Sequence, residues 1–165
     1  MEERVSNELI FLYQQLIDCS IESLTEEVLS IAETASRRVV LSCRVKDSST
    51  LAKKMIAKST KSIMDIHDVY GIRVLVFSVS EAYAVLKAIT DFFPSFLDHD
   101  YIANPKTRSD KPHLAGKSLR LLQVIAQKNS VPFEIQITTF EFNDCNELLH
   151  EEYHREKYQT TDLSD

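Results

Sequence analysis

One segment constrains the fold more than any other: GIRVLVFSV, residues 71–79, in which apolar side chains run almost without interruption. A strand of this composition is typical of the interior of a sheet, where both faces are buried. An interior strand needs further layers packed on the sheet to shield it from water. The segment therefore predicts a central strand in a sheet that is covered by other elements.

The rest of the chain supplies helix-type and strand-type patterns around this strand. Residues 6–38 carry apolar residues at helical spacing, and Ser23 with Glu26 has a capping-box pattern that predicts a division into two helices. The other expected elements are a strand at 39–46, a helix at 47–63 capped by Asp47 or Ser48, a helix at 80–93 capped by Ser80, a hairpin of strands 118–127 and 132–138, and a helix at 141–158. The order ααβαβαββα predicts an α+β fold, with helices packed against a mixed sheet.

The length of 165 residues and the hydrophobic content of 44% suit one domain that buries most of its apolar surface. Within residues 1–165 we expect N-terminal helices at 1–38, a core at 39–158 and a frayed tail at 159–165. No apolar run approaches the roughly 20 residues that cross a bilayer, and the first ten residues lack a signal-peptide pattern. We therefore expect a cytoplasmic protein without membrane attachment.

The charge and the glycine content limit how this chain can bind phosphates. Its formal net charge of -6 argues against general nucleic-acid binding, because that function requires a dominant basic surface. Only 2 glycines are present, which excludes a Gly-rich loop that wraps phosphates with backbone N–H groups. A small anionic ligand would therefore have to be bound by cationic side chains in a local pocket.

Suitable cations lie in two neighbouring segments. Arg44 and Lys46 are two residues apart on one face of the expected strand, and Lys54, Lys58 and Lys61 recur along one face of the expected helix. Together they would suit a triphosphate. The alternative is a solvated lysine stripe, which is the usual meaning of such spacing.

Two carboxylates are candidates for a metal site. Asp68 precedes the expected turn at Gly71, and Glu134 lies in FEIQITT, residues 133–139, whose apolar side chains alternate strictly with polar ones. Mg²⁺ is commonly held by one or two carboxylates together with substrate phosphates, so this pair would suffice if the two strands are neighbours. The alternatives are a capping or turn role for Asp68 and a solvated strand face around Glu134.

A competing motif lies near the end of the chain. HEEYH, from His150 to His154, matches H-E-x-x-H, which on a helix places two imidazoles on one face with a glutamate as general base. This motif is typical of zinc peptidases. A third ligand is needed, and His113 and Glu147 follow no recognised spacing. A zinc peptidase is therefore the least favoured functional hypothesis for this chain.

Five segments within residues 40–157 carry a more specific pattern. They are RVKDSSTLAKKM (44–55), DIHDVYGIRVLV (65–76), DYIANPK (100–106), FEIQITT (133–139) and NELLHEEY (146–153). In this order they resemble the R-x-K…K-M, D-L-x-G-I-R-V, D-Y-I-x-x-P-K, E-I-Q-I-R-T and A-E-x-x-H blocks of the synthetase domain of the RelA/SpoT family. These bacterial alarmone (ppGpp) synthetases of the stringent response transfer pyrophosphate from ATP to the 3′-hydroxyl of a guanine nucleotide.

The resemblance implies a nucleotidyltransferase-like fold with a mixed sheet of about five strands, and it implies a role for each matching residue. Asp68 and Glu134 would hold Mg²⁺, and Glu134 would also orient or deprotonate the attacking hydroxyl. The residues implied on the ATP side are Arg44, Lys46, Lys54 and Arg73, and those implied on the acceptor side are Lys106, Lys117, Arg120 and Gln136.

The sequence departs from the family on the acceptor side. Where the family has G-Y-[QR]-S-[LI]-H, this chain has AGKSLR, so that Gly116 replaces the tyrosine that stacks on the acceptor base and Arg120 replaces the histidine. Thr138 replaces the arginine of E-I-Q-I-R-T, and the linker at 107–114 is longer than usual. Loss of a stacking ring removes roughly 1 to 3 kcal/mol of base recognition.

Two functions follow from the resemblance. The first is a pyrophosphokinase that uses ATP and modifies GDP, GTP or another 3′-hydroxyl, such as that of an adenine nucleotide or a tRNA end. The second is a module of the same fold that binds nucleotides or a partner without turnover, which the replaced acceptor loop favours. An exposed apolar stripe on the first helices would suit assembly into a homo-oligomer.

Overall fold

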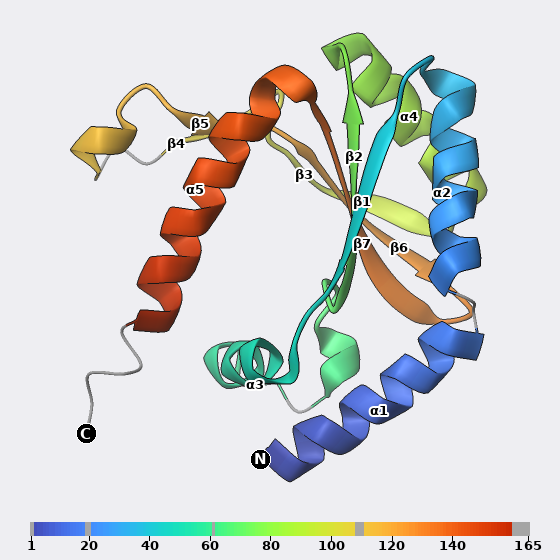
Figure 1. The fold of residues 1–165 in the computed structure, drawn as a ribbon, viewed down its shortest axis with the longest axis vertical. Helices are drawn as coiled ribbons and strands as arrows, with labels where there is room; N and C mark the ends of the chain where they lie inside the picture. The colour runs from blue at the N-terminus through green and yellow to red at the C-terminus, as the bar shows by residue number, and fades with distance from the viewer. Residues whose placement is uncertain (1, 19–20, 61, 108–110, 160–165) are drawn as a thin grey trace.

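The computed structural model describes residues 2–18, 21–60, 62–107 and 111–159 (Figure 1). The helices are α1 (Glu2–Asp18), α2 (Ile21–Ala35), α3 (Ser48–Ala57), α4 (Val79–Phe92) and α5 (Phe140–Gln159), with short 3-10 turns η1 (Ile63–Asp65) and η2 (Pro112–Leu114). The strands are β1 (Val40–Val45), β2 (Tyr70–Val76), β3 (Ser95–Asp100), β4 (Lys106–Thr107), β5 (Ser118–Leu119), β6 (Leu122–Lys128) and β7 (Val131–Thr139). No described helix has the length and apolar character needed to span a membrane.

The main sheet has five strands in the order β1-β2-β7-β6-β3. β2 and β7 run parallel, whereas β1 with β2, β6 with β7 and β3 with β6 are antiparallel. Strands β4 and β5 form a separate two-stranded sheet beside α5 (Figure 1). The predicted α+β fold, with a mixed sheet flanked by helices, is confirmed.

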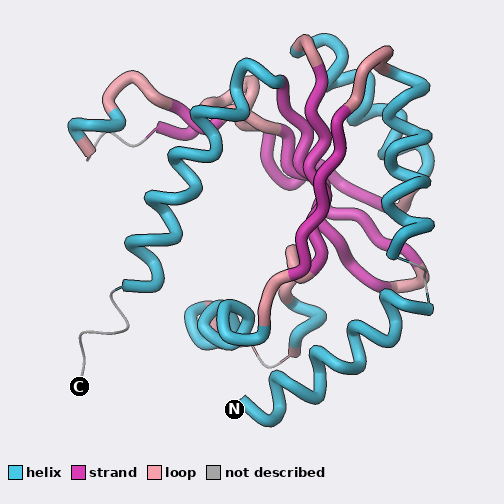
Figure 2. Tube along the Cα trace, viewed as in Figure 1, coloured by secondary structure: helices cyan, strands magenta, loops and turns pink. Residues whose placement is uncertain are grey.

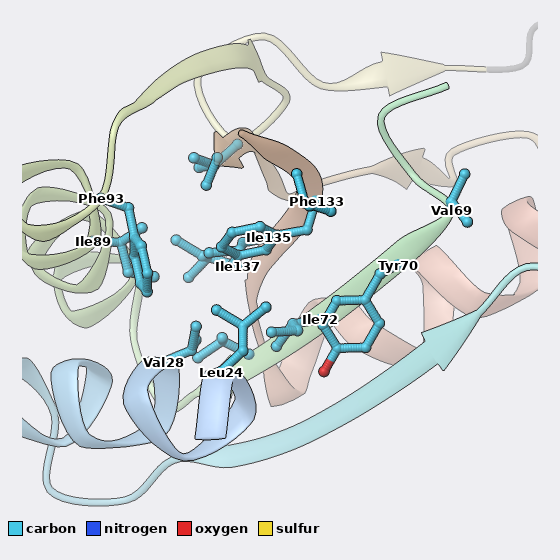
Figure 3. Packing of buried hydrophobic residues seen from close by; sticks show 14 of the residues in the cluster. Leu24, Val28, Val69, Tyr70, Ile72, Ile89, Phe93, Phe133, Ile135 and Ile137 are labelled. Carbon is cyan, nitrogen blue, oxygen red and sulfur yellow. The ribbon is translucent and has the colours of Figure 1, made fainter. Parts of the chain in front are cut away.

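Helices cover the two faces of the main sheet unequally. α2 and α4 lie against one face, while α3 and α5 lie on the other side (Figures 1 and 2). The covered face contains the hydrophobic core, where β2 and β7 meet side chains of α2 and α4 such as Leu24, Val28 and Ile89 (Figure 3). Burying side chains of this size contributes about 1.5 to 3 kcal/mol each. The opposite face of the sheet is therefore free to carry polar residues.

Strand β2 differs from the prediction for residues 71–79. It lies inside the sheet as expected, but its side chains alternate between buried and half-buried, with Ile72 and Val74 in the core. The apolar pattern also runs past the end of the strand, because Phe77 and Val79 are exposed. Only one face of β2 is buried in the core. β7, which pairs with both β2 and β6, is the middle strand.

Two predicted helix starts are wrong. α2 begins at Ile21, so Ser23 and Glu26 lie within the helix and cannot form the predicted capping box. Ser78, rather than Ser80, is the N-cap of α4, because its hydroxyl accepts a hydrogen bond from the Glu81 N–H at 3.2 Å. Either serine satisfies a capping pattern locally, and packing of the helix on the sheet selects between them.

Other boundaries match more closely. Asp47 caps α3 as predicted, accepting a hydrogen bond from the Thr50 N–H at 2.8 Å, but α3 ends at Ala57, earlier than the expected residue 63. The hairpin between β6 and β7 is confirmed. Its two-residue turn consists of Asn129 and Ser130, both with positive φ (50° and 65°), which is the geometry of a tight type I′ connection.

Strand β3 is missing from the sequence prediction. Its segment SFLDHD carries charged residues and most of its side chains are exposed, because it lies at the edge of the sheet and contains an irregularity between Leu97 and His99. The predicted strand at 118–127 is divided into β5 and β6 by residues 120–121. This division places Arg120 at the junction of the two sheets.

Candidate active site

The pocket lies on the polar face of the main sheet, where β1, β2 and β7 run side by side. Arg44 pairs with Gly71, and Gly71 pairs with Glu134, so these residues form one row across the three strands. A Cβ atom at Gly71 would meet nothing within 4 Å. The glycine therefore leaves open space between the side chains of Arg44 and Glu134.

This space is part of a pocket of about 250 Å³. Its walls come from β1, β2, β7, the turn before β2 and the inner side of α5, and the lining residues are Ser42, Cys43, Arg44, Asp68, Gly71, Ile72, Arg73, Glu134, Gln136, Glu147 and His150. The pocket thus brings together residues that are almost 110 positions apart in the chain. Both candidate metal ligands, Asp68 and Glu134, line it.

Asp68 lies between two lysines. Its carboxylate contacts Lys54 Nζ at 2.5 Å and Lys46 Nζ at 3.3 Å. Burial acts to raise the pKa of Asp68, but the two ammonium groups outweigh burial and lower this pKa to about 2. Burial lowers the pKa of Lys46, and the Asp68 carboxylate opposes that effect. Asp68 is therefore an ionised group at the centre of a cationic cluster.

Only part of the predicted lysine stripe belongs to this cluster. Lys54 reaches Asp68, whereas Lys58 is exposed at the C-cap of α3, and Lys61 lies outside the described residues. Lys46 is the first residue after β1, and its backbone N–H donates to the Val69 carbonyl at 2.7 Å. Main-chain contacts thus hold the Lys46 segment against the turn that carries Asp68.

Glu134 is the second acid of the pocket, and only 7% of it is exposed. Gln136 Nε2 donates to its Oε1 at 2.7 Å, and Gln123 Nε2 donates to its Oε2 at 3.0 Å. Burial raises the pKa of Glu134, and the negative charge of Asp68 raises it further, while the two amide donors oppose the shift. A carboxyl with a raised pKa is better suited to accept a proton than an ordinary surface glutamate.

Arg73 connects Glu134 to α5 through Gln136. Its Nε and Nη2 donate to Gln136 Oε1 at 3.2 and 3.1 Å, and its Nη1 contacts Asn143 at 3.5 Å and forms an ion pair with Glu147. These bonds leave the Gln136 amide nitrogen directed at Glu134. Of the implied ATP-side residues, Arg44 and Arg73 line the pocket, whereas Lys46 and Lys54 do not line it and contact its Asp68.

The implied acceptor-side residues are less clustered. Gln136 lines the pocket, but Lys106, Lys117 and Arg120 do not. Lys106 Nζ lies 6.0 Å from the ring centres of Tyr101 and Tyr153, and the Arg120 guanidinium lies 5.2 Å from the ring centre of Phe142. Lys117 is exposed.

The sequence does not predict three neighbours of this site: His150, which lines the pocket, and Gln123 and Asn143, which contact its residues Glu134 and Arg73. Gln123 is a polar residue between apolar neighbours in β6, which is the one local signal of its position. Its contact with Glu134 depends on the register that pairs Gln123 with Gln136. Asn143 and His150 lie on α5, and no sequence pattern fixes which side of that helix faces the sheet.

The zinc hypothesis receives no support from the described part of the chain. Within it, no three His, Cys, Asp or Glu side chains are grouped to hold a metal ion. His150 lines the pocket of Glu134, and His113 contacts Glu152 at 3.4 Å. The side chain of His154 lies outside the described residues.

A mixed sheet whose open face carries two acids beside clustered cations is typical of proteins that bind nucleotide phosphates. The family model described as the region found in RelA / SpoT proteins matches residues 43–160. The chain therefore belongs to the RelA/SpoT family, as the five sequence blocks predict. The match begins within β1 and includes every residue that lines the pocket except Ser42.

Solved structures show the same fold. Small alarmone synthetase 1 from Bacillus subtilis is 21% identical, with a TM-score of 0.65 over 93% of this chain and 80% of that chain. A GTP pyrophosphokinase family protein from Streptococcus pneumoniae is 19% identical, with a TM-score of 0.63 over 90% of this chain and 78% of that chain. The first of these proteins has also been solved bound to its product pppGpp and bound to AMPCPP.

Proposed function

We propose that this protein is a pyrophosphokinase that transfers pyrophosphate from ATP to the 3′-hydroxyl of a nucleotide, with GDP or GTP as the first acceptors to test. The observation that carries the proposal is the presence of Asp68 and Glu134 in one pocket, beside the cations Arg44, Lys46 and Lys54. Family membership and the nucleotide-bound relatives support the same conclusion.

The chemistry requires neutralisation of charge and alignment of the reacting atoms. The acceptor 3′-oxygen would attack the β-phosphorus of ATP, a new P–O bond would form, and the bond from that phosphorus to the α-phosphate oxygen would break, releasing AMP. Lys46 and Lys54, which contact Asp68, would offset phosphate charge. Glu134, with its raised pKa, would accept the hydroxyl proton.

The pocket fits the Mg²⁺ that the family implies. Asp68 and Glu134 supply carboxylate oxygens, the ligands that Mg²⁺ prefers, and substrate phosphates complete such sites. When bound, the ion would supply further neutralisation of phosphate charge, while Lys46 and Lys54 hold Asp68 ionised.

The test is transfer of label from γ-labelled ATP to a panel of GDP, GTP, adenine nucleotides and tRNA, followed by thin-layer separation. Glu134→Gln keeps the size of the side chain but removes its basicity, and we expect transfer to fall by roughly 100- to 10,000-fold. Glu141→Gln, an exposed residue of α5, is the matched control and should transfer as the wild type does.

A binding module without turnover is the alternative, and the replacement of the stacking tyrosine by Gly116 favours it. It predicts that the wild-type protein binds ATP with an affinity measurable by calorimetry but transfers label to no acceptor. That result would overturn the enzymatic proposal and leave the binding function.

A further inference from the structure

Three residues at which the chain departs from the family blocks contact one another. Arg120 replaces the histidine of the acceptor loop, Thr138 replaces the arginine of E-I-Q-I-R-T, and Asn146 occupies the alanine position of A-E-x-x-H. They come from the β5–β6 junction, the end of β7 and the first half of α5. Only the main chain of Arg120 takes part, so the Thr138 and Asn146 side chains bind this point of the loop through its backbone.

The contact is a closed set of hydrogen bonds around the main chain of Arg120. Asn146 Oδ1 accepts from the Arg120 N–H at 2.8 Å, and Asn146 Nδ2 donates to the Arg120 carbonyl at 2.9 Å. Thr138 Oγ1 donates to the same carbonyl at 2.6 Å and accepts from Asn146 Nδ2 at 3.2 Å. The amide of Asn146 thus holds both polar groups of one backbone residue.

These polar groups are buried. Thr138 is 1% exposed and Asn146 is 3% exposed, so each would be costly to keep without partners. Among the described residues, no buried side-chain nitrogen or oxygen lacks a hydrogen-bond partner. Thr138 and Asn146 therefore form one buried, fully paired polar contact with the Arg120 main chain.

The set fixes the end of the acceptor loop against α5. The Arg120 side chain does not line the pocket; its Nε donates to Ser118 Oγ at 3.0 Å and its guanidinium lies 5.2 Å from the ring centre of Phe142 on α5. Ahead of it, Leu114 is buried and its carbonyl accepts from the Lys117 N–H at 2.9 Å. The segment from Leu114 to Arg120 is thus held at both ends.

We propose that Asn146 and Thr138 are positioning residues that fix residues 114–120 and thereby set the affinity and choice of the acceptor nucleotide. This inference rests on the proposed function, because it concerns the second substrate of that reaction. In the family pattern a tyrosine ring of this loop stacks on the acceptor base. Here the loop has Gly116 at that position, and the shape of the anchored main chain replaces the ring in defining the acceptor side.

The test combines Asn146→Ala, Thr138→Val and Thr138→Ser, with Asp144→Ala, an exposed residue of α5, as the control. Hydrogen exchange of the Arg120 amide reports directly on the bond to Asn146. Calorimetry with GDP and with ADP, in the presence of an ATP analogue that cannot be cleaved, measures acceptor binding without turnover. Binding of that analogue alone measures the ATP side.

We expect Asn146→Ala to speed exchange of the Arg120 amide and to weaken acceptor binding, each by about tenfold, which is the effect of losing one or two buried hydrogen bonds. Binding of the ATP analogue should change by less than about twofold. Thr138→Val should act in the same direction, and Thr138→Ser should restore wild-type values, because serine keeps the hydroxyl. Thr138→Val also serves as the decisive variant if Asn146→Ala does not fold.

Equal weakening of acceptor binding and of ATP-analogue binding would overturn the proposal, as would an acceptor affinity that does not change while the Arg120 amide exchanges faster. Failure of wild-type protein to bind GDP or ADP would overturn it as well. A wild-type protein that binds an acceptor but transfers no label would refute the proposed pyrophosphokinase and leave the positioning role in place. The two failures are thereby separated.

Discussion

Gln136 donates a hydrogen bond to the Glu134 carboxylate at 2.7 Å, although both residues belong to the same strand, two positions apart. They lie on the same face of β7 because side chains alternate along a strand. Arg73 orients the amide of Gln136, because its Nε and Nη2 both donate to Gln136 Oε1. The position of the acid is thus determined by a chain of contacts that begins at Glu147 on α5.

Replacing Gln136 with methionine tests this chain. Methionine has a similar volume, but it neither donates to Glu134 nor accepts from Arg73. We expect label transfer to fall by about 10- to 100-fold, because Glu134 loses the donor that orients it. Steady-state kinetics should place the loss in kcat, with the KM for ATP changed less than threefold. Gln127→Met, on the exposed end of β6, is the control, and an equal loss there would contradict the argument.

The pKa of Asp68 predicts how stability depends on pH. This carboxyl titrates near 3.8 when unfolded and at about 2 when folded, so its ionised form stabilises the folded protein. The contribution, about 2 kcal/mol, is complete above pH 4 to 5 and is lost as the pH falls through 2. Denaturant unfolding should show Asp68→Asn less stable than wild type at pH 6.

The same comparison repeated at lower pH supplies the check. The difference in free energy of unfolding between Asp68→Asn and wild type should shrink steadily from pH 4 to pH 2. Asp65 is an exposed residue of η1, and the corresponding difference for Asp65→Asn should not change with pH by this amount. A difference that is constant over this range would mean that Lys46 and Lys54 do not lower the pKa of Asp68.

Restoring the family tyrosine at position 116 should fail to restore base stacking. Gly116 has a φ of 77°, a left-handed conformation that residues other than glycine and asparagine rarely adopt. We expect Gly116→Tyr to lower the free energy of unfolding by about 1 to 2 kcal/mol and to leave GDP affinity unimproved. Gly116→Asn should be tolerated. Tighter GDP binding by Gly116→Tyr, measured by calorimetry, would show that the loop can still present a ring to the base.

The polar face of β7 could be predicted because its signal is local. Alternation from Phe133 to Thr139 separates the core side chains from Glu134 and Gln136 whatever the strand pairs with. The family blocks then indicate Asp68 as the partner acid. What they cannot supply is the set of contacts that holds each acid, because those contacts depend on register and on the orientation of α5.

The errors in the sequence prediction have the same physical origin. Strand β3 is exposed at the sheet edge, so its sequence has no apolar pattern to reveal it. Gln123 contacts Glu134 only because β6 pairs with β7 in one register, and a shift of one residue would turn it to the other face. No sequence pattern indicates the role of Asn146, because its contacts with Arg120 and Thr138 form only in the folded chain.

Gly71 has a consequence for how this protein can change over evolutionary time. Glycine inside a strand lowers stability by roughly 0.5 to 1 kcal/mol relative to alanine, and a Cβ atom here would meet nothing within 4 Å. Substitution by alanine would therefore meet no resistance from the fold. Use of the space between Arg44 and Glu134 by a substrate would supply the reason to keep that position without a side chain.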